Sequence, residues 1–243
     1  MSAATALGAD PVGAVLFDLD DTLFAQSAWL DGAWTAVAER AAANGVDPDD
    51  LEPALRSIAA QGSARGGIID RALERIGRTD VDVGPLVAAF SAHAPRRLDL
   101  APGVSAALQT LGSRVPLGLV TDGNPTIQRA KVTALGVADH FAVMVFSDEL
   151  GREHRKPDPL PFLTALRALD VEPALAVYVG DRPEKDVAGA LGIGMRCIRV
   201  CTGEYATAPD HPEATAVVDD AVAAIDMVLD LVPLPAMGAP PTG

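Results

Sequence analysis

Two aspartates stand two positions apart where an apolar run ends, and their types and spacing suit catalysis. Asp18 and Asp20 follow the apolar segment 14–17. Side chains of an extended segment alternate between two faces, so both carboxylates start out pointing the same way. Two like charges that close repel each other unless something positive lies between them. A divalent cation, a phosphoryl group, or both would relieve this repulsion.

Three further polar motifs follow along the chain, each at the end of a predicted strand or the start of the next helix. They are Thr-Asp-Gly-Asn at 121–124, Lys-Pro-Asp-Pro at 156–159 and Gly-Asp-Arg-Pro-Glu-Lys-Asp at 180–186. Each one alone is also typical of a turn or a helix cap. The carboxyl ends of parallel strands meet at one edge of a sheet, so the fold would bring all of these motifs to a single crevice. Their convergence favours one functional site.

The elements that must position these motifs alternate between strand and helix. Short apolar segments predict strands at 14–18, 116–121, 141–146, 174–180, 195–200 and 215–218. Helical patterns lie between or after them at 125–135, 159–169, 183–191 and 221–231. This alternation predicts an α/β fold with a doubly wound parallel sheet, and it places the site at the carboxyl ends of the strands.

Residues 27–97 break the alternation, because they contain helical patterns and no good strand. The helical patterns cover 29–44, 51–61, 68–76 and 83–94. We therefore predict a small all-helical domain inserted after the first strand, with residues 12–26 and 98–232 forming the α/β core. Residues 233–243 are rich in proline and are expected to form a mobile tail.

Composition excludes several classes of function. The net charge of −14 argues against binding to nucleic acid or to an anionic membrane, and it requires any phosphate site to carry its own positive charge. No apolar run approaches the ~20 residues of a membrane span, so a soluble cytoplasmic protein is expected. Cys197 and Cys201 are interpreted as small residues in or beside a buried strand. The composition leaves both a monomer and a homodimer open.

The four motifs, in this order, resemble motifs I to IV of the haloacid dehalogenase (HAD) superfamily. The helical insertion resembles that superfamily's C1-type cap, and the resemblance covers about residues 14–203. The segments Thr-Asp-Gly-Asn-Pro, Lys-Pro-Asp-Pro and Val-Gly-Asp-Arg are similar to the branch of phosphatases that act on small molecules. The resemblance therefore implies hydrolysis of a small phosphorylated metabolite, with a sugar or polyol phosphate preferred.

The resemblance also implies a role for each motif residue. Asp18 would be the nucleophile that forms an aspartyl phosphate, and Asp20 would act as the general acid and base. Thr121 would hold the phosphoryl oxygens, and Lys156 would neutralise their charge. Mg²⁺ would be bound through oxygen ligands of Asp18, Asp20 (by its backbone carbonyl) and Asp181.

The remaining predicted site residues have supporting roles. Asp186 would either support the waters on the metal or orient Lys156. Thr22 would fix its loop by hydrogen bonding. The predicted substrate-binding set is Thr22, Arg65, Asp122, Gly123 and Asn124.

Other activities on the same fold are less favoured or stay open. The phosphonatase branch uses a lysine of the cap, whereas the three lysines here are at 131, 156 and 185, outside the insertion. The dehalogenase branch lacks an acid two positions after the nucleophile, whereas Asp20 is present. Phosphoryl transfer to a sugar, and a catalytically silent domain that binds a ligand or a partner, stay open.

The loop before Lys156 is longer than the usual family pattern. Arg-Glu-His-Arg at 152–155 separates Gly151 from Lys156. These side chains would either add positive charge at the mouth of the site or form a solvated loop whose charges compensate one another. A displaced Lys156 would remove the basis for its assignment.

Overall fold

The structure, a computed structural model, describes residues 7–8, 10–62 and 66–232. The predicted substrate contact Arg65 and the predicted tail at 233–243 lie outside the described residues. Contacts between Cα atoms divide the chain into two units. The first, here called the sheet unit, comprises the described residues up to Phe24, Leu100–Gly123, and those from Val137 onward. The second, here called the helical unit, comprises Ala25–Asp99 and Asn124–Gly136.

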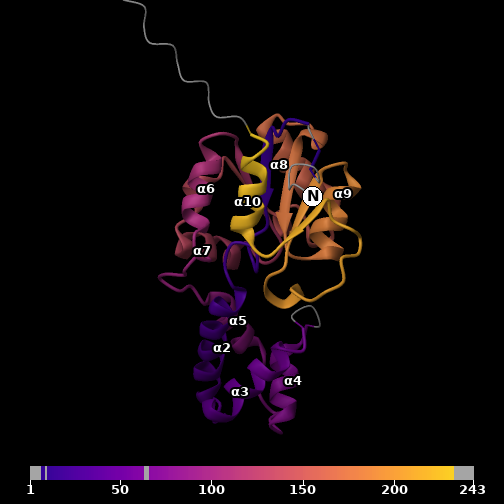
Figure 1. Ribbon diagram of the computed structural model, residues 1–243. Coiled ribbons are helices and arrows are strands. Elements are labelled where there is room, and N and C mark those ends of the chain that lie inside the picture. Colours follow the sequence, from indigo (N-terminus) through magenta and orange to yellow (C-terminus); the bar gives the residue numbers. More distant parts are fainter. Residues whose placement is uncertain (1–6, 9, 63–65, 233–243) are drawn as a thin grey trace, which may run out of the picture. The chain divides into compact units, whose positions relative to one another are not determined.

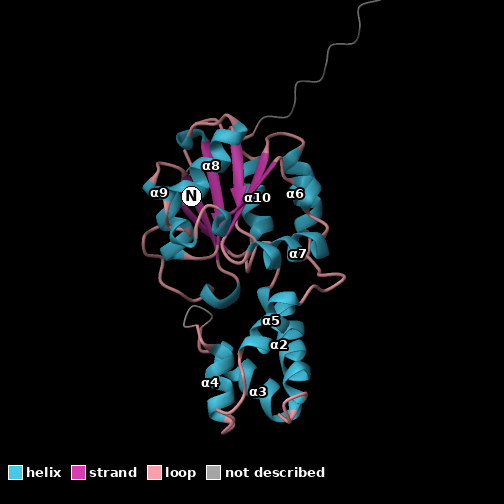
Figure 2. Cartoon of the chain, turned by 180° about the vertical axis from the view of Figure 1, so that it is seen from behind, coloured by secondary structure: helices cyan, strands magenta, loops and turns pink. Residues whose placement is uncertain are grey.

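A six-stranded parallel sheet forms the centre of the sheet unit (Figures 1 and 2). Its strand order is β3-β2-β1-β4-β5-β6, so the chain winds outward from β1 in both directions, as a doubly wound fold requires. The strands are β1 (Ala14–Phe17), β2 (Leu117–Thr121), β3 (Val143–Phe146), β4 (Ala176–Gly180), β5 (Arg196–Val200) and β6 (Ala216–Val218). All six predicted strands and the predicted fold class are confirmed.

Helices cover the sheet, which explains why its central strands read as continuous apolar runs. Every residue of β1, β2 and β4 is buried. Helices α8 (Pro159–Leu169) and α9 (Ala188–Gly192) pack on one face, where Phe162 joins Leu16 and Tyr178 in one apolar cluster. Helices α6 (Val104–Gly112) and α10 (Ala221–Leu229) lie side by side (Figure 1).

The predicted helix starts are accurate where a proline follows a capping side chain. Helices α7 (Pro125–Leu135) and α8 have the predicted bounds, and their caps Asn124 and Asp158 accept hydrogen bonds from the backbone two residues on. The pattern at 183–191 forms a π-helical turn, Pro183–Val187, followed by α9. Short 3₁₀ turns complete the unit at Ala138–His140, Ser147–Glu149, Arg152–His154, Pro173–Leu175 and Gly203–Tyr205.

Helix α6 was not predicted. It begins after Gly103, whose φ of 83° places it in the left-handed region, and no side chain caps its first turn. A glycine at this point is typical of the end of a helix. Helix α6 also lacks the capping side chain and the proline that predicted the starts of α7 and α8.

The helical unit contains the four helices predicted within the insertion. They are α2 (Gln26–Ala42), α3 (Pro48–Ala59), α4 (Ile68–Arg75) and α5 (Gly84–Ala92). Their buried side chains form a separate core that includes Trp34, Val37, Leu51, Leu55, Leu73 and Leu86.

Helix α7, which the sequence assigned to the α/β core, groups with the helical unit by its contacts. The ammonium group of Lys131 lies 4.7 Å from the centre of the Trp29 ring, and Leu98 N donates to Ala134 O at 2.9 Å. That the helical unit acts as a C1-type cap stays a prediction.

Within the described ranges, no helix combines the length and the apolar character needed to cross a membrane.

Candidate active site

The motif residues gather at the carboxyl ends of the central strands. Asp18 follows β1 directly, Thr121 is the last residue of β2, and Asp181 follows β4. The strand pairing continues past β1, because Asp18 N donates to Val179 O at 2.9 Å. Several side chains of this region are buried although they are polar or charged, among them Asp18, Thr121, Lys156, Asp181 and Asp186. Buried charges on this scale require partners or a ligand.

Lys156 is held by three acceptors. Its ammonium group lies 2.6 Å from Asp18 Oδ1, 2.7 Å from Asp186 Oδ1 and 3.0 Å from the hydroxyl of Tyr178. Burial alone would lower the pKa of Lys156, but the carboxylates of Asp18 and Asp186 raise this pKa well above its usual value. The side chain is therefore a fixed positive charge against the predicted nucleophile.

Three carboxylates lie close enough together to hold a divalent cation. One oxygen from each of Asp18, Asp181 and Asp186 lies within 4.8 Å of the others. Asp181 Oδ1 is buried and has no hydrogen-bond partner among the described residues. If all three acids are ionised, the single ammonium group of Lys156 leaves two negative charges in this buried cluster. A divalent cation would balance them, and hard carboxylate oxygens are ligands that Mg²⁺ favours.

The pKa values of two of these acids express the same imbalance. Burial raises the pKa of Asp18 to about 7, against the opposing effect of Lys156. Burial, reinforced by the charges of Asp186 and Asp18, raises the pKa of Asp181 to about 9. Without a cation, the cluster reduces its charge by taking up protons.

Gly180 allows Asp186 to fold back onto the strand end. A Cβ atom at position 180 would lie only 2.5 Å from Asp186 Cγ. Asp186 Oδ2 accepts from Arg182 N at 3.0 Å, while Oδ1 accepts from Lys156. Of the two roles left open for Asp186, these contacts favour the orientation of Lys156.

Asp122 holds the loop that carries Lys156. Its Oδ1 accepts from Ser147 Oγ at 2.7 Å and from the backbone N of Lys156 at 3.1 Å, and its Oδ2 accepts from Lys185 Nζ at 3.0 Å. Burial raises the pKa of Asp122, but the charges of Lys156 and Lys185, together with the hydrogen bonds from Ser147 and Lys185, outweigh burial, so that this pKa is lowered overall. The carboxylate stays ionised and is engaged by the protein.

The longer loop before Lys156 does not displace it. Arg155 Nη2 lies 2.6 Å from Asp148 Oδ2, Arg152 Nε lies 3.8 Å from the same oxygen, and His154 Nδ1 lies 3.4 Å from Asp158 Oδ2. The basic side chains of the loop therefore lie against acids, which matches the compensated loop.

Comparison with known proteins identifies the family. A family model described as haloacid dehalogenase-like hydrolase matches residues 12–194. The chain belongs to this family.

Curated relatives of this HAD-like hydrolase include phosphatases. A glyceraldehyde 3-phosphate phosphatase of Methanopyrus kandleri is 35% identical over 203 residues, which cover 80% of this chain and 86% of the relative. A phosphoserine phosphatase of Thermus thermophilus is 38% identical over 165 residues, which cover 67% of this chain and 64% of the relative. Among solved structures, a 2-haloacid dehalogenase of Pseudomonas syringae pv. Tomato has a TM-score of 0.63 at 29% identity. That comparison covers 90% of this chain and 99% of the dehalogenase.

Asp20 and Thr22 of the HAD-like hydrolase lie in the loop that follows Asp18. Asp20 is partly exposed and forms a backbone bridge with Phe24. Thr22 Oγ1 is buried and has no hydrogen-bond partner among the described residues, so these residues do not provide the side-chain hydrogen bond that was predicted to fix the loop. The backbone holds this turn instead, with Leu23 N donating to Leu19 O at 3.0 Å.

Two predicted substrate contacts have local backbone roles. Gly123 has a φ of 120°, which favours glycine. Asn124 Oδ1 accepts from Thr126 N at 2.9 Å and so caps α7. A contact of either residue with substrate stays a prediction.

Three residues of the site were missed by sequence reasoning: Ser147, Tyr178 and Lys185. Tyr178 lies inside an apolar strand, where its hydroxyl was the only signal. Lys185 belongs to the 180–186 motif, in which only Asp181 and Asp186 were assigned roles. Ser147 carried no signal, because its pairing with Asp122 spans 25 positions and depends on the fold.

Proposed function

We propose that this HAD-like hydrolase is a Mg²⁺-dependent phosphomonoesterase that acts on a small phosphorylated metabolite through an aspartyl phosphate on Asp18. The observation that carries the proposal is the buried cluster of Asp18, Asp181 and Asp186, in which Asp18 and Asp186 contact Lys156. The names of the two curated phosphatases support a small phosphorylated substrate. A sugar or polyol phosphate is the preferred class.

The donor set fits Mg²⁺. Asp18 and Asp181 would hold the ion together with the backbone carbonyl of Asp20. Asp181 Oδ1, for which the described residues provide no hydrogen-bond donor, supports this assignment. When bound, Mg²⁺ supplies charge neutralisation at the nucleophile and at the phosphoryl oxygens.

Asp18 is suited to attack phosphorus. One of its carboxylate oxygens accepts from Lys156, and a carboxylate has a second oxygen that can act as the nucleophile. Attack forms a bond between that oxygen and phosphorus and breaks the bond from phosphorus to the alcohol oxygen. The product is an aspartyl phosphate, and water then attacks its phosphorus to release inorganic phosphate and regenerate Asp18.

Asp20 would move the protons in both steps. In its protonated form it gives a proton to the departing alcohol oxygen, and in its ionised form it takes one from the attacking water. Thr121 would hold the phosphoryl oxygens, and Lys156 would offset their charge. The fixed position of Lys156 means that little reorganisation is needed during the reaction.

Hydrolysis of a haloacid is the second candidate, and the similarity to the solved 2-haloacid dehalogenase favours it. That reaction would also use Asp18 as the nucleophile. A departing halide needs no proton, however, and its substrate brings no phosphoryl charge. Asp20 and the three-carboxylate cluster are better suited to an alkoxide leaving group and a phosphoryl substrate.

A hydrolysis assay tests the proposal. The wild-type protein should release phosphate from 4-nitrophenyl phosphate with Mg²⁺ and lose this activity in EDTA. The Asp18→Asn variant should lose about 10³-fold or more, since it lacks the nucleophile. Equal activity of the two proteins, or halide release from a haloacid without Mg²⁺, would overturn the proposal. Inactivity of the wild type toward a broad panel of phosphomonoesters would favour the silent binding domain.

A further inference from the structure

The segment that follows β5 contacts the loop of the proposed general acid. Thr202 Oγ1 donates a hydrogen bond to the backbone carbonyl of Asp21, the residue after Asp20. Glu204 N donates to Asp21 Oδ2 at 3.3 Å. These partners lie more than 180 positions apart in sequence, so the contact belongs to the folded sheet unit and has no local origin.

The backbone at both sides of this contact is unusual. Asp21 has a φ of 56°, in the left-handed region that residues with a side chain seldom occupy. Gly203 has a φ of 62°, and a Cβ atom there would lie 2.1 Å from Asp21 Cγ. Only glycine fits against the Asp21 side chain at this distance. The 202–204 segment therefore supports a costly conformation directly next to Asp20.

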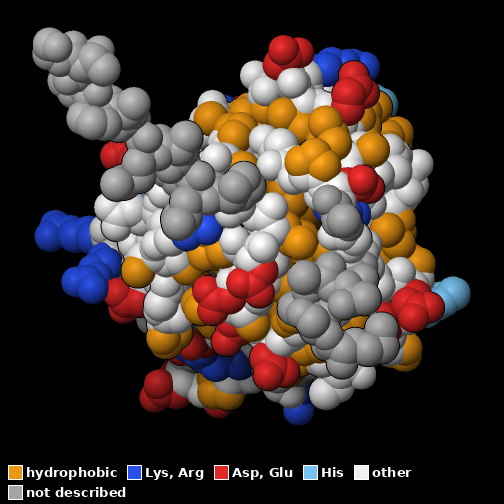
Figure 3. Space-filling model, turned by 45° about the horizontal axis from the view of Figure 1, so that its top comes forward, with side chains coloured by type: hydrophobic (Ala, Val, Ile, Leu, Met, Phe, Trp, Pro, Cys, Tyr) orange, Lys and Arg blue, Asp and Glu red, His pale blue; other side chains and the backbone are white. Residues whose placement is uncertain are grey.

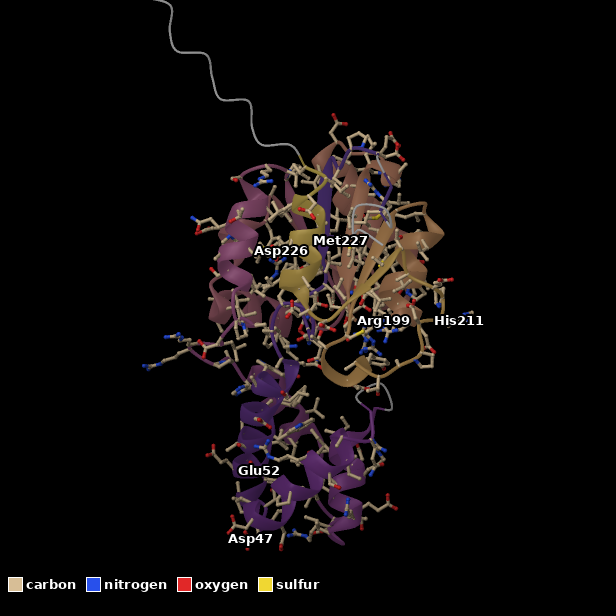
Figure 4. The ribbon with its side chains drawn as sticks, in the orientation of Figure 1. Asp47, Glu52, Arg199, His211, Asp226 and Met227 are labelled. Atoms are coloured by element: carbon tan, nitrogen blue, oxygen red, sulfur yellow. The ribbon has the colours of Figure 1, made fainter. Side chains whose placement is uncertain are left out.

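Two arginines bind the residues directly after the 202–204 segment and so anchor it to the rest of the sheet unit. Arg199 of β5 is 2% exposed, and its Nη2 donates to Tyr205 O at 2.9 Å and to Ala208 O at 2.8 Å. Figure 4 shows Arg199 where the strand meets this loop, with His211 at the loop's outer edge. Arg182 Nη2 donates to the Tyr205 hydroxyl at 2.6 Å, and its guanidinium group lies 4.3 Å from the ring centre. Because Arg182 follows Asp181, the segment connects the Asp21 loop to the Asp181 loop.

We propose that Thr202 is a positioning residue, which holds the Asp20–Asp21 backbone so that the Asp20 carboxyl group meets the leaving oxygen. This inference rests on the proposed function, because it requires Asp20 to be the general acid. Thr202 would act through the backbone carbonyl of Asp21, to which its hydroxyl donates. A misplacement of about 1 Å in a catalytic group can cost about 10²-fold in rate, so one hydrogen bond to this backbone is enough to matter.

The dependence of rate on the leaving group tests the inference. A poor leaving group such as the alkoxide of glycerol phosphate needs a proton, whereas 4-nitrophenolate needs little help. The measured quantity is kcat/KM, because it reports the step in which the leaving group departs. We expect Thr202→Val to lower kcat/KM about 10-fold with glycerol phosphate and under about 3-fold with 4-nitrophenyl phosphate. The larger loss is a part of the rate enhancement of about 10²–10⁴-fold that general acid catalysis supplies.

Two further variants separate positioning from a general structural effect. Thr202→Ser keeps the hydroxyl group and should restore the wild-type ratio between the two substrates. Thr164→Val removes a hydroxyl that donates to Leu160 O within α8, and it should leave both rates unchanged. Gly203→Ala, which forces Asp21 to move, should reproduce the signature of Thr202→Val even if the latter folds poorly.

The outcomes distinguish this inference from the proposed function. Asp20→Asn should also lower kcat/KM more with glycerol phosphate than with 4-nitrophenyl phosphate, and by a larger ratio than Thr202→Val does. If Asp20→Asn shows this difference but Thr202→Val and Gly203→Ala lose equal factors with both substrates, the positioning role is wrong and the phosphatase proposal stands. If Asp18→Asn is as active as wild type, the phosphatase proposal itself fails.

Discussion

Tyr178 is the least expected residue around Lys156. Its hydroxyl accepts from Lys156 Nζ at 3.0 Å and lies 3.1 Å from Val120 O, to which it donates. Tyr178→Phe would leave both of these buried groups short of a partner. We expect it to lower the free energy of unfolding by about 1–3 kcal/mol, measured by urea denaturation.

Tyr205→Phe is the matched control for Tyr178→Phe. It removes a hydroxyl that bonds to Arg182, but Tyr205 is only partly buried, so water can replace the lost contact. Tyr205→Phe should lower the free energy of unfolding by less than about 1 kcal/mol. Equal losses in the two variants would mean that the Tyr178 hydroxyl is not part of a buried network.

The raised pKa of Asp181 gives the metal-free protein a distinctive pH dependence. Its pKa is raised from 3.8 to about 9, so the folded protein binds a proton that the unfolded chain releases between these values. Stability in EDTA should therefore fall as pH rises from about 4 to about 9, by at most about 1.4 kcal/mol per pH unit for the proton on Asp181. Thermal unfolding across this range measures it.

Asp181→Asn separates this effect from the general repulsion of an acidic protein. Because the amide does not titrate, the decline in EDTA should be shallower in the variant than in wild type. Saturating Mg²⁺ should restore wild-type stability at about pH 9, since the cation replaces the proton. Parallel profiles of stability against pH for the two metal-free proteins would show that the pKa of Asp181 is not raised by folding.

At the level of elements, the turn between β4 and α9 sets the relation of Asp181 to Asp186. Gly180→Ala would bring a Cβ atom to 2.5 Å from Asp186 Cγ and push that carboxylate away from Lys156. We expect a stability loss of about 1–3 kcal/mol and at least about a 10-fold lower kcat/KM. Gly192→Ala in α9, where a Cβ meets nothing within 4 Å, should be neutral in both measurements. An active Gly180→Ala variant of wild-type stability would contradict this.

Sequence reasoning located the strands and the site loops because their signals are local. Each buried strand is a short apolar run that ends in polar or glycine residues, and helices α7 and α8 start at a proline after a capping side chain. The four motifs follow strand ends, so one rule of parallel sheets was enough to bring them together. The predicted cluster of Asp18, Lys156, Asp181 and Asp186 is present in the fold.

The missed features depend on contacts between distant segments. Helix α6 has no cap signal, and its apolar face is explained by its contacts with α10 and with the 3₁₀ turn Ala138–His140. The hydroxyl bonds of Ser147 to Asp122 and of Thr202 to Asp21 join loops that no local pattern relates. Helix α7 alternates regularly with the strands, yet its contacts place it with the helical unit.

For the whole molecule, the net charge of −14 should govern how an anionic substrate approaches. Acidic side chains are spread over the face shown in Figure 3. At low salt the net charge repels a phosphate dianion at long range, and salt screens this repulsion over a Debye length of about 10 Å at 0.1 M. With Mg²⁺ saturating, kcat/KM should therefore rise with added NaCl while kcat stays constant. A kcat/KM that falls with salt would show that local positive charge dominates the approach.

The central claim, a phosphoryl group carried by Asp18, can be tested by trapping it. The Asp20→Asn variant should still react with 4-nitrophenyl phosphate, whose leaving group needs little protonation, but it should hydrolyse the aspartyl phosphate slowly. Acid quenching during turnover with Mg²⁺, followed by peptide mass mapping, should find one phosphoryl group on the peptide that contains Asp18. Steady release of phosphate with no phosphoryl group on Asp18 at any quench time, in the variant and in wild type, would contradict the account.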